Sequence, residues 1–169
     1  AGDVAAAREF FERMVVRDVV SWTTLISGSS RNGCHWDAVE AFRGFLVHNR
    51  GLLAEATLVS VLSACANLDG AEGLAVGTAV HAYVIRHEVV FTAFLDTALI
   101  DMYAKCGHVE KSVEVFERMQ GRDTTAWTAI ICGLATNGQA SRALELFEDM
   151  ERSSARPDRV TFIGVLSAC

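Results

Sequence analysis

The feature that most constrains the fold of this chain is an internal repeat. The segment Trp-Thr-Thr-Leu-Ile-Ser-Gly that begins at Trp22 returns 105 residues later, at Trp127, as Trp-Thr-Ala-Ile-Ile-Cys-Gly. The segment Val-Leu-Ser-Ala-Cys begins at Val61 and again at Val165, which are 104 residues apart. Repetition over such lengths is the signature of a chain built from stacked supersecondary units.

Each unit holds two segments whose apolar residues recur at i, i+3, i+4 and i+7, which is the spacing of one face of an α-helix. One such stripe consists of Trp127, Ile130, Ile131 and Leu134. Glycines such as Gly138 stand between the two segments, and glycine takes the left-handed conformation that ends a helix. A single pair of short helices cannot bury its apolar face, so the pattern predicts helix pairs stacked into a solenoid.

The units resemble pentatricopeptide repeats (PPR motifs) along the whole chain. The resemblance rests on Trp-x-x-Leu-Ile, then Asn-Gly, then Ala-Leu-Glu-Leu-Phe-Glu-x-Met, closing on Arg-Pro-Asp at 156–158. The segment Leu-Ile-Asp-Met-Tyr-Ala-Lys-Cys-Gly at 99–107 resembles the short motif of the plant subfamily that cycles standard, long and short repeats. The fold that this implies is an all-α, right-handed α-solenoid (superhelix) of antiparallel helix–turn–helix repeats. The expected repeats are a partial short one at 1–18, a standard one at 19–54, a long one at 55–92, a short one at 93–123, a standard one at 124–158 and the start of a long one at 159–169.

The resemblance implies single-stranded RNA as the partner, because repeats of this class read about one base each with two or three side chains. In the family, the residues at the fifth and last places of a repeat meet the base edge. The fifth place falls on Thr23, Thr97 and Thr128, and the last place falls on Asp18, Ala54, Asp123 and Asp158.

A threonine hydroxyl donates or accepts a hydrogen bond, whereas an ionised aspartate only accepts and therefore suits a base with N–H donors. The threonine–aspartate pair resembles the family's guanine-preferring combination, so we expect guanine at the repeats 93–123 and 124–158. Threonine with alanine in repeat 19–54 implies a purine. Repeat 55–92 has a valine at the fifth place and should read little. The expected RNA is 5′-purine–any–G–G-3′.

Two further sets of residues take their roles from the resemblance. Second-place residues wedge between bases in the family, and here they are Val20, Phe94 and Thr125, of which the last two depart from the usual aliphatic residue. Arg31 and Lys105 occupy matching places near the end of the first helix. They are candidates for phosphate contacts, although ordinary surface charge explains them equally well.

The formal net charge of −6 taken alone argues against a nucleic-acid partner. A local groove reconciles the two observations if the acids of the second helices face away from it. That arrangement predicts few phosphate contacts and a shallow salt dependence. The acids in question are Glu9, Glu12, Glu114, Glu117, Glu145, Glu148 and Asp149.

Other classes of protein find less support in the sequence. There is no C-x-x-C, H-x-E or glycine-rich phosphate loop, so no enzyme, cofactor or small-molecule substrate is expected. Cys106 and His108 have no second pair nearby, and His81 and His87 are too far apart on a helix to share a metal ion. The five cysteines fit buried thiols in a reducing compartment. No apolar run approaches the roughly 20 residues that span a membrane.

A tetratricopeptide-like scaffold that binds proteins or peptides, with no nucleic-acid role, is the main alternative. A degenerate fragment that folds poorly is a third interpretation. The PPR resemblance itself implies organelle RNA processing in the mitochondrion or chloroplast, most specifically site recognition for C-to-U RNA editing with editing-complex proteins as partners. Proteins of that subfamily often end in a deaminase-like zinc domain, whose signature is missing here. Because the chain begins at Ala1 and stops at Cys169 within a helical pattern, we expect it to be part of a longer protein.

Overall fold

The computed structural model describes residues 3–48, 51–68 and 70–168, and all regular secondary structure in those residues is helical. This confirms the predicted all-α class. The helices fall into two compact units, residues 1–90 and 91–169. The helices are α1 (Val4–Arg13), α2 (Val19–Arg31), α3 (His35–His48), α4 (Glu55–Cys65), α5 (Gly70–Arg86), α6 (Ala93–Lys105), α7 (Val109–Arg118), α8 (Thr124–Thr136), α9 (Ala140–Arg152) and α10 (Arg159–Ala168).

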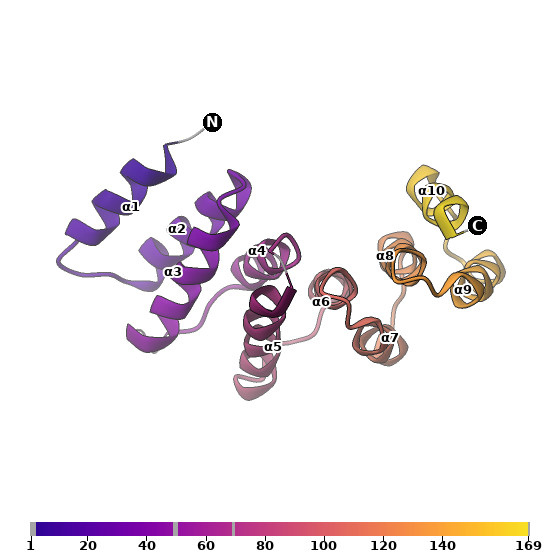
Figure 1. Ribbon diagram of the computed structural model, residues 1–169. Helices are drawn as coiled ribbons and strands as arrows, with labels where there is room; N and C mark the ends of the chain where they lie inside the picture. Colours follow the sequence, from indigo (N-terminus) through magenta and orange to yellow (C-terminus); the bar gives the residue numbers. More distant parts are fainter. Residues whose placement is uncertain (1–2, 49–50, 69, 169) are drawn as a thin grey trace. The chain divides into compact units, whose positions relative to one another are not determined.

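In the first unit, α2 packs against α3, and α4 contacts both of them. Helix α5 packs against α4, and α1 packs against α2 (Figure 1). The turn between α2 and α3 contains Gly33 with a φ of +76°, a left-handed conformation that residues with a Cβ rarely adopt. The largest fully buried side chains of this unit are Ile26, Phe42, Phe45, Leu58 and Leu62.

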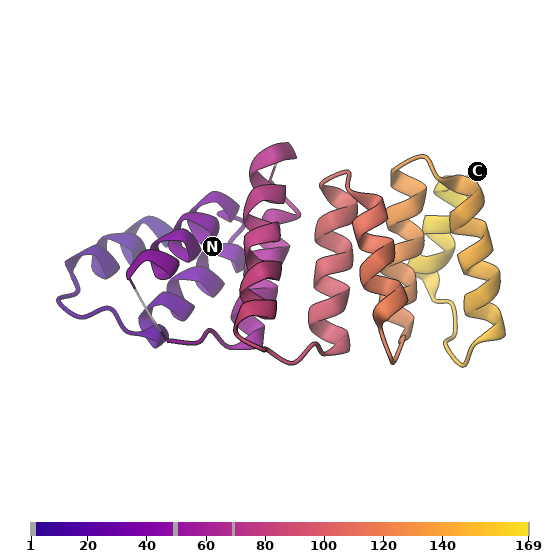
Figure 2. The same ribbon diagram turned by 90° about the horizontal axis from the view of Figure 1, so that it is seen from below.

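The second unit has two layers. Helices α6, α8 and α10 form one layer and α7 and α9 form the other, as Figure 1 shows nearly end-on and Figure 2 shows from the side. Gly107 and Gly138, with φ of +80° and +73°, end the first helix of a pair and let the chain turn back. The core between the layers contains Leu95, Leu99, Ile100, Ile130, Ile131 and Leu134, all fully buried.

Most residues of the predicted apolar stripes are buried or half-buried, and the most exposed ones lie on α1 and α10. Phe10 on α1 is 69% exposed, and Leu166 on α10 is 72% exposed. The periodicity of both segments is that of a core face. Helix α1 packs against α2, and α10 packs against α8 and α9, so part of each stripe meets no neighbouring helix in this structure.

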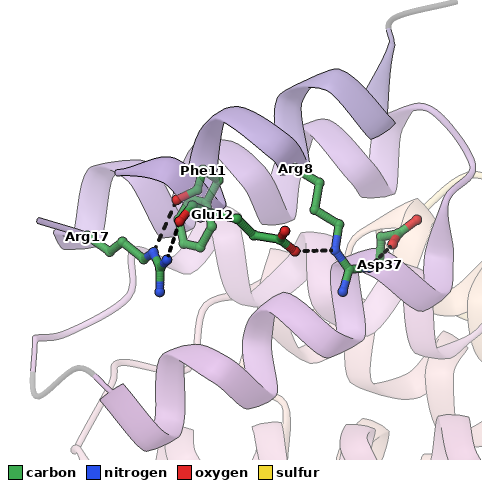
Figure 3. A network of polar contacts seen from close by, with 5 residues as sticks. All are labelled: Arg8, Phe11, Glu12, Arg17 and Asp37. Atoms are coloured by element: carbon green, nitrogen blue, oxygen red, sulfur yellow. Dashed lines mark hydrogen bonds and ion pairs between the residues drawn. The ribbon is translucent and has the colours of Figure 1, made fainter. Parts of the chain in front are cut away.

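An arginine just after α1 holds the end of that helix (Figure 3). The Arg17 guanidinium donates to the carbonyl oxygens of Phe11 at 3.1 Å and Glu12 at 2.7 Å, both in the last turn of the helix, and the Phe11 oxygen also accepts from the Met14 N–H at 3.2 Å. Arg8 links the same helix to α3, since its guanidinium lies 3.2 Å from the Glu12 carboxylate and 2.7 Å from that of Asp37. Such exposed ion pairs stabilise by at most about 1 kcal/mol each.

The same arrangement recurs in the segment 93–123, which is the second short repeat expected from the sequence. The Arg122 guanidinium donates to the carbonyl oxygens of Phe116 at 3.2 Å and Glu117 at 3.0 Å, and it lies over the Phe116 ring at 4.5 Å. In the sequence, this arrangement corresponds to an Arg-Asp pair at the end of both expected short repeats. The arginine therefore closes one helix, and the following aspartate begins the next.

Candidate nucleic-acid interface

An open groove of about 330 Å³ lies along α6, α8 and the start of α10 in the second unit. The fifth-place threonines Thr97 and Thr128 both line it, and so do Thr125 and Lys105. Small residues form much of the remaining wall, including Gly133. Two of the residues predicted to read bases are therefore brought to one surface from successive repeats.

Helical periodicity explains why these threonines face the groove. On α6, Thr97, Asp101 and Lys105 are spaced at four-residue intervals and form a polar stripe beside the apolar one. On α8, Thr128 and Cys132 occupy the corresponding stripe, again four residues apart. Each first helix thus buries one face in the core and presents the adjacent face to the groove.

The last-place aspartates all lie at the beginning of a first helix. The carboxylates of Asp18, Asp123 and Asp158 accept from the backbone N–H three residues later, at 2.8, 2.9 and 2.9 Å. All three aspartates are exposed. They are N-caps, a role for which aspartate is strongly preferred, and the cap leaves part of the acceptor capacity of each carboxylate unused.

The N-cap role was not predicted, although an aspartate before an apolar periodic segment is its usual signal. Thr92 caps α6 in the same way, since its hydroxyl accepts from the Leu95 N–H at 3.2 Å, whereas Ala54 offers α4 no side-chain cap. The first helices begin at positions 19, 55, 93, 124 and 159, which coincide with the first residues of the expected repeats.

The stability that the Asp158 cap contributes to the folded chain should depend on pH. Hydrogen bonds from the backbone N–H and hydroxyl of Thr161 hold the pKa of Asp158 below its ordinary value of 3.8. A carboxyl group with a depressed pKa stabilises the folded state above its unfolded pKa, and this is lost as the pH falls through the folded pKa. We expect Asp158→Ala to lower the melting temperature at neutral pH and the difference from wild type to shrink below pH 3.8.

Melting curves recorded by circular dichroism from neutral to acid pH check this prediction. Glu151→Ala, which removes an exposed carboxylate from α9, is the matched control and should show no such pH-dependent difference. A difference for Asp158→Ala that stayed constant across the pH range would show that charge is not responsible.

The second-place residues are exposed in both units. Val20 is 70% exposed and Phe94 is 63% exposed, and Thr125 is exposed as well. Val160 occupies the equivalent place on α10 and is 54% exposed. Exposed apolar side chains at a constant place in the repeat leave apolar surface available to a ligand, because none of them belongs to the core.

The two candidate phosphate-binding residues differ in their surroundings. Lys105 lines the groove, and its Nζ lies 2.9 Å from the carboxylate of Asp101, which also lines it. The Arg31 Nε in the first unit donates to the Ser27 carbonyl oxygen at 3.2 Å. Both cations are exposed, but the charge of Lys105 is largely offset by its acidic neighbour.

The acids predicted to face outward on the second helices are all exposed. Several are paired with cations on their own helix, such as Glu114 with Lys111 at 2.7 Å and Glu148 with Arg152 at 2.9 Å. Much of the negative charge therefore lies on helices other than those that line the groove.

The four cysteines in the described residues, Cys34, Cys65, Cys106 and Cys132, are thiols that form no disulfide with one another, and Cys169 lies outside the described residues. Burial raises the pKa of the Cys106 and Cys132 thiols, so both stay protonated at neutral pH.

Within the described part of the chain, no three His, Cys, Asp or Glu side chains gather as metal ligands would. No helix in that part has the length and apolarity of a membrane span.

Comparison with known proteins supports the predicted family. The chain matches the PPR repeat family over residues 122–169 and the PPR repeat over residues 20–48 and 97–124. A pentatricopeptide repeat-containing protein of Arabidopsis thaliana is 43% identical over 99% of the chain, which covers 36% of that relative. A mitochondrial pentatricopeptide repeat-containing protein of the same plant is 38% identical, again over 99% of the chain and 25% of the relative.

Among solved structures, the pentatricopeptide repeat protein PPR10 in complex with an 18-nt psaJ RNA element shares this fold. It has a TM-score of 0.80 and 21% sequence identity, and the match covers 99% of this chain and 25% of that one. The chain thus spans between a quarter and about a third of the length of the proteins it matches here. On the evidence of its repeats, helix pairs and relatives, the chain belongs to the pentatricopeptide repeat family of plants.

Proposed function

We propose that this chain binds single-stranded RNA and reads individual bases along the first helices of its repeats. The observation that carries the proposal is that Thr97 and Thr128 both line the groove. Each lies on the polar face of its helix, four residues from another groove-lining side chain, and not on the face that packs in the core. The exposed aspartates at the starts of α8 and α10 supply the second acceptor that each threonine needs. The relative PPR10, whose structure contains RNA, supports the same class of ligand.

The expected chemistry at each base is a pair of acceptors. An ionised aspartate accepts only, and a threonine hydroxyl can present lone pairs to a ligand. Unstacked bases are read by hydrogen bonds to their Watson–Crick edges, and guanine offers N–H donors on that edge. We therefore propose guanine at the Thr97/Asp123 and Thr128/Asp158 places. Val20, Phe94 and Thr125 would contact base faces.

Replacing the threonine should change which base is preferred. In Thr128→Asn, the carboxamide presents both an N–H donor and a carbonyl acceptor, which suits the donor flanked by acceptors on uracil. We expect preference at that base to move from guanine toward uracil by about 1–3 kcal/mol, the usual discrimination of a good side-chain–base contact. Competition binding with short RNAs that differ at single bases measures it.

The neighbouring repeat provides the control. The base opposite Thr97/Asp123 should remain guanine in Thr128→Asn, because the substitution lies one repeat away. Unchanged selectivity at both bases would mean that the repeat register is wrong. Binding of C-terminal peptides in place of RNA would favour the tetratricopeptide-like alternative.

The salt dependence of RNA binding should respond to Asp101. This carboxylate lies 2.9 Å from Lys105 inside the groove, so it competes with phosphate for the ammonium group. We expect Asp101→Asn to bind RNA more tightly at low salt. The slope of log K against log salt should steepen by about 0.7, the value for one more phosphate contact on a single strand.

Glu114→Gln tests whether this effect depends on location. Glu114 pairs with Lys111 at 2.7 Å on α7, outside the groove. Glu114→Gln removes one negative charge, as Asp101→Asn does, but at a site away from the groove. Equal gains in the two variants would assign the effect to total charge and would argue against a phosphate contact by Lys105.

At a finer level, we propose that the chain belongs to a protein that selects sites for C-to-U RNA editing in an organelle. Its mitochondrial relative favours the mitochondrion, and the chloroplast is the other compartment that the family resemblance implies. Crosslinking of the protein to RNA in plant organelles, followed by sequencing, tests this. Enrichment of segments next to edited cytidines is expected, and enrichment of segments without edited sites would contradict it.

A further inference from the structure

A buried threonine contacts both members of one proposed base-reading pair. Thr161, at the third place of the repeat that begins at 159, has a relative exposure of 0%. Its Oγ1 lies 2.6 Å from the Thr128 hydroxyl and 2.9 Å from the Asp158 carboxylate. It also accepts from the Asp158 N–H at 3.2 Å. A polar side chain at this depth needs such partners, and here all three belong to the proposed reading pair.

The direction of the protons in this cluster follows from counting donors. An ionised carboxylate cannot donate, so the single proton of the Thr161 hydroxyl goes to Asp158. The contact between the two threonine hydroxyls then needs the proton of Thr128. The depressed pKa of Asp158 is consistent with its being the final acceptor. Once its proton is committed to Thr161, Thr128 presents only lone pairs to the groove.

That constraint matters for base selection. The Watson–Crick edge of guanine carries two adjacent donors, N1–H and the 2-amino group. Adenine and cytosine each present a donor beside an acceptor, and uracil has one donor between two acceptors. A hydroxyl free to rotate can donate to adenine N1 as readily as it accepts from guanine. A hydroxyl held as an acceptor beside a carboxylate fits guanine alone.

We propose that Thr161 is a specificity-determining residue that acts through Thr128, by holding its hydroxyl as an acceptor and so excluding adenine. This inference rests on the proposed function and deepens it. It extends the reading pair to a third residue, contributed by the following repeat and buried beneath the groove.

The other repeat junctions provide contrasts within the same chain. At the preceding junction the third place holds Ala126, and the Thr97 hydroxyl donates to the Ala93 carbonyl oxygen at 2.7 Å instead. Thr57 occupies the third place after the repeat 19–54 and lies 3.5 Å from the Thr23 hydroxyl. There the last place is Ala54, so no carboxylate directs the protons. Removing the Thr161 hydroxyl should therefore affect one base and leave the others alone.

The test compares Thr161→Val, which keeps the shape and loses the hydroxyl, with Thr161→Ser, which keeps the hydroxyl. Preference for guanine over adenine at the base opposite Thr128 is measured by competition between short single-stranded RNAs. We expect Thr161→Val to reduce the preference by roughly tenfold, the size of one hydrogen-bond discrimination, and Thr161→Ser to retain it. Selectivity opposite Thr97 should stay as in wild type.

Thr57→Val is the matched control, because Thr57 is also buried, with a relative exposure of 1%, at the same repeat place. It should not change selectivity opposite Thr128. If Thr161→Val does not melt cooperatively, Thr161→Ala removes the same hydroxyl without adding bulk. Full guanine preference in a folded variant lacking the hydroxyl overturns the inference while leaving the proposed function intact. A wild-type chain that binds RNA without base preference overturns the proposed function itself, and the inference with it.

Discussion

Trp127→Ala is expected to destabilise the chain by about 3–5 kcal/mol, the usual cost of truncating a buried aromatic residue. Trp127 is 5% exposed, and its ring lies 4.8 Å from that of Phe116 at an interplanar angle of 70°. It joins α8 to α7, and the Arg122 guanidinium lies over it at 5.8 Å. Its removal would leave a cavity between the two layers of the second unit.

Urea denaturation followed by circular dichroism measures this loss, and Trp36→Ala is the matched control. Trp36 on α3 is 46% exposed, and the Arg43 guanidinium carbon lies over its ring, 5.7 Å from the ring centroid. Its truncation should therefore lower the free energy of unfolding by no more than about 1 kcal/mol. Similar small losses for both tryptophans would show that the packing of α8 on α7 contributes little to cooperative folding. The predicted loss is a large part of the free energy of unfolding of a typical domain, which is roughly 5–15 kcal/mol.

Gly133→Ala should destabilise the chain although alanine is the better helix former. A Cβ at Gly133 would lie 2.7 Å from the Cβ of Ala104 on α6, and neither atom belongs to a side chain that can rotate away. The two helices must then move apart. We expect a net loss of about 1–3 kcal/mol, as for other overpacked cores, measured by the same urea denaturation.

Gly28→Ala tests the same substitution at the same repeat place with the opposite expected sign. No atom lies within 4 Å of a Cβ built at Gly28, so the change relieves the cost of glycine in a helix without a clash. It should stabilise the chain by about 0.5–1 kcal/mol. Destabilisation by both substitutions would mean that the clash with Ala104 does not explain the effect at Gly133.

The substitution at Gly133 should affect the groove as well as the stability of the chain. It lines the groove beside Thr128, and the close approach of α8 to α6 is what brings Thr128 and Thr97 to one wall. Gly133→Ala should therefore also weaken RNA binding if the proposed function is correct. Gly28→Ala, which leaves the second unit unchanged, should not.

Local patterns in the sequence were enough to predict the helices and their order. Stripes such as Leu99, Ile100 and Tyr103 indicate a core face, and Gly107 and Gly138 mark turns that the structure places at positive φ. The resemblance to a known family added the candidate base-reading residues, and family membership is shown by the relatives. Both kinds of inference depend on residues a few positions apart, where helical geometry relates spacing to direction.

Contacts between repeats could not be predicted in this way. That Thr161 reaches Thr128 and that Gly133 meets Ala104 both depend on how helices some 30 residues apart pack together. Periodicity tells which face of a helix is buried, but it leaves the axial offset and separation of two helices undetermined. Those are settled only when side chains interdigitate at the density of a packed core. The sequence alone therefore determined the repeating helices and their inner and outer faces, whereas tertiary packing decided which polar atoms meet at the groove.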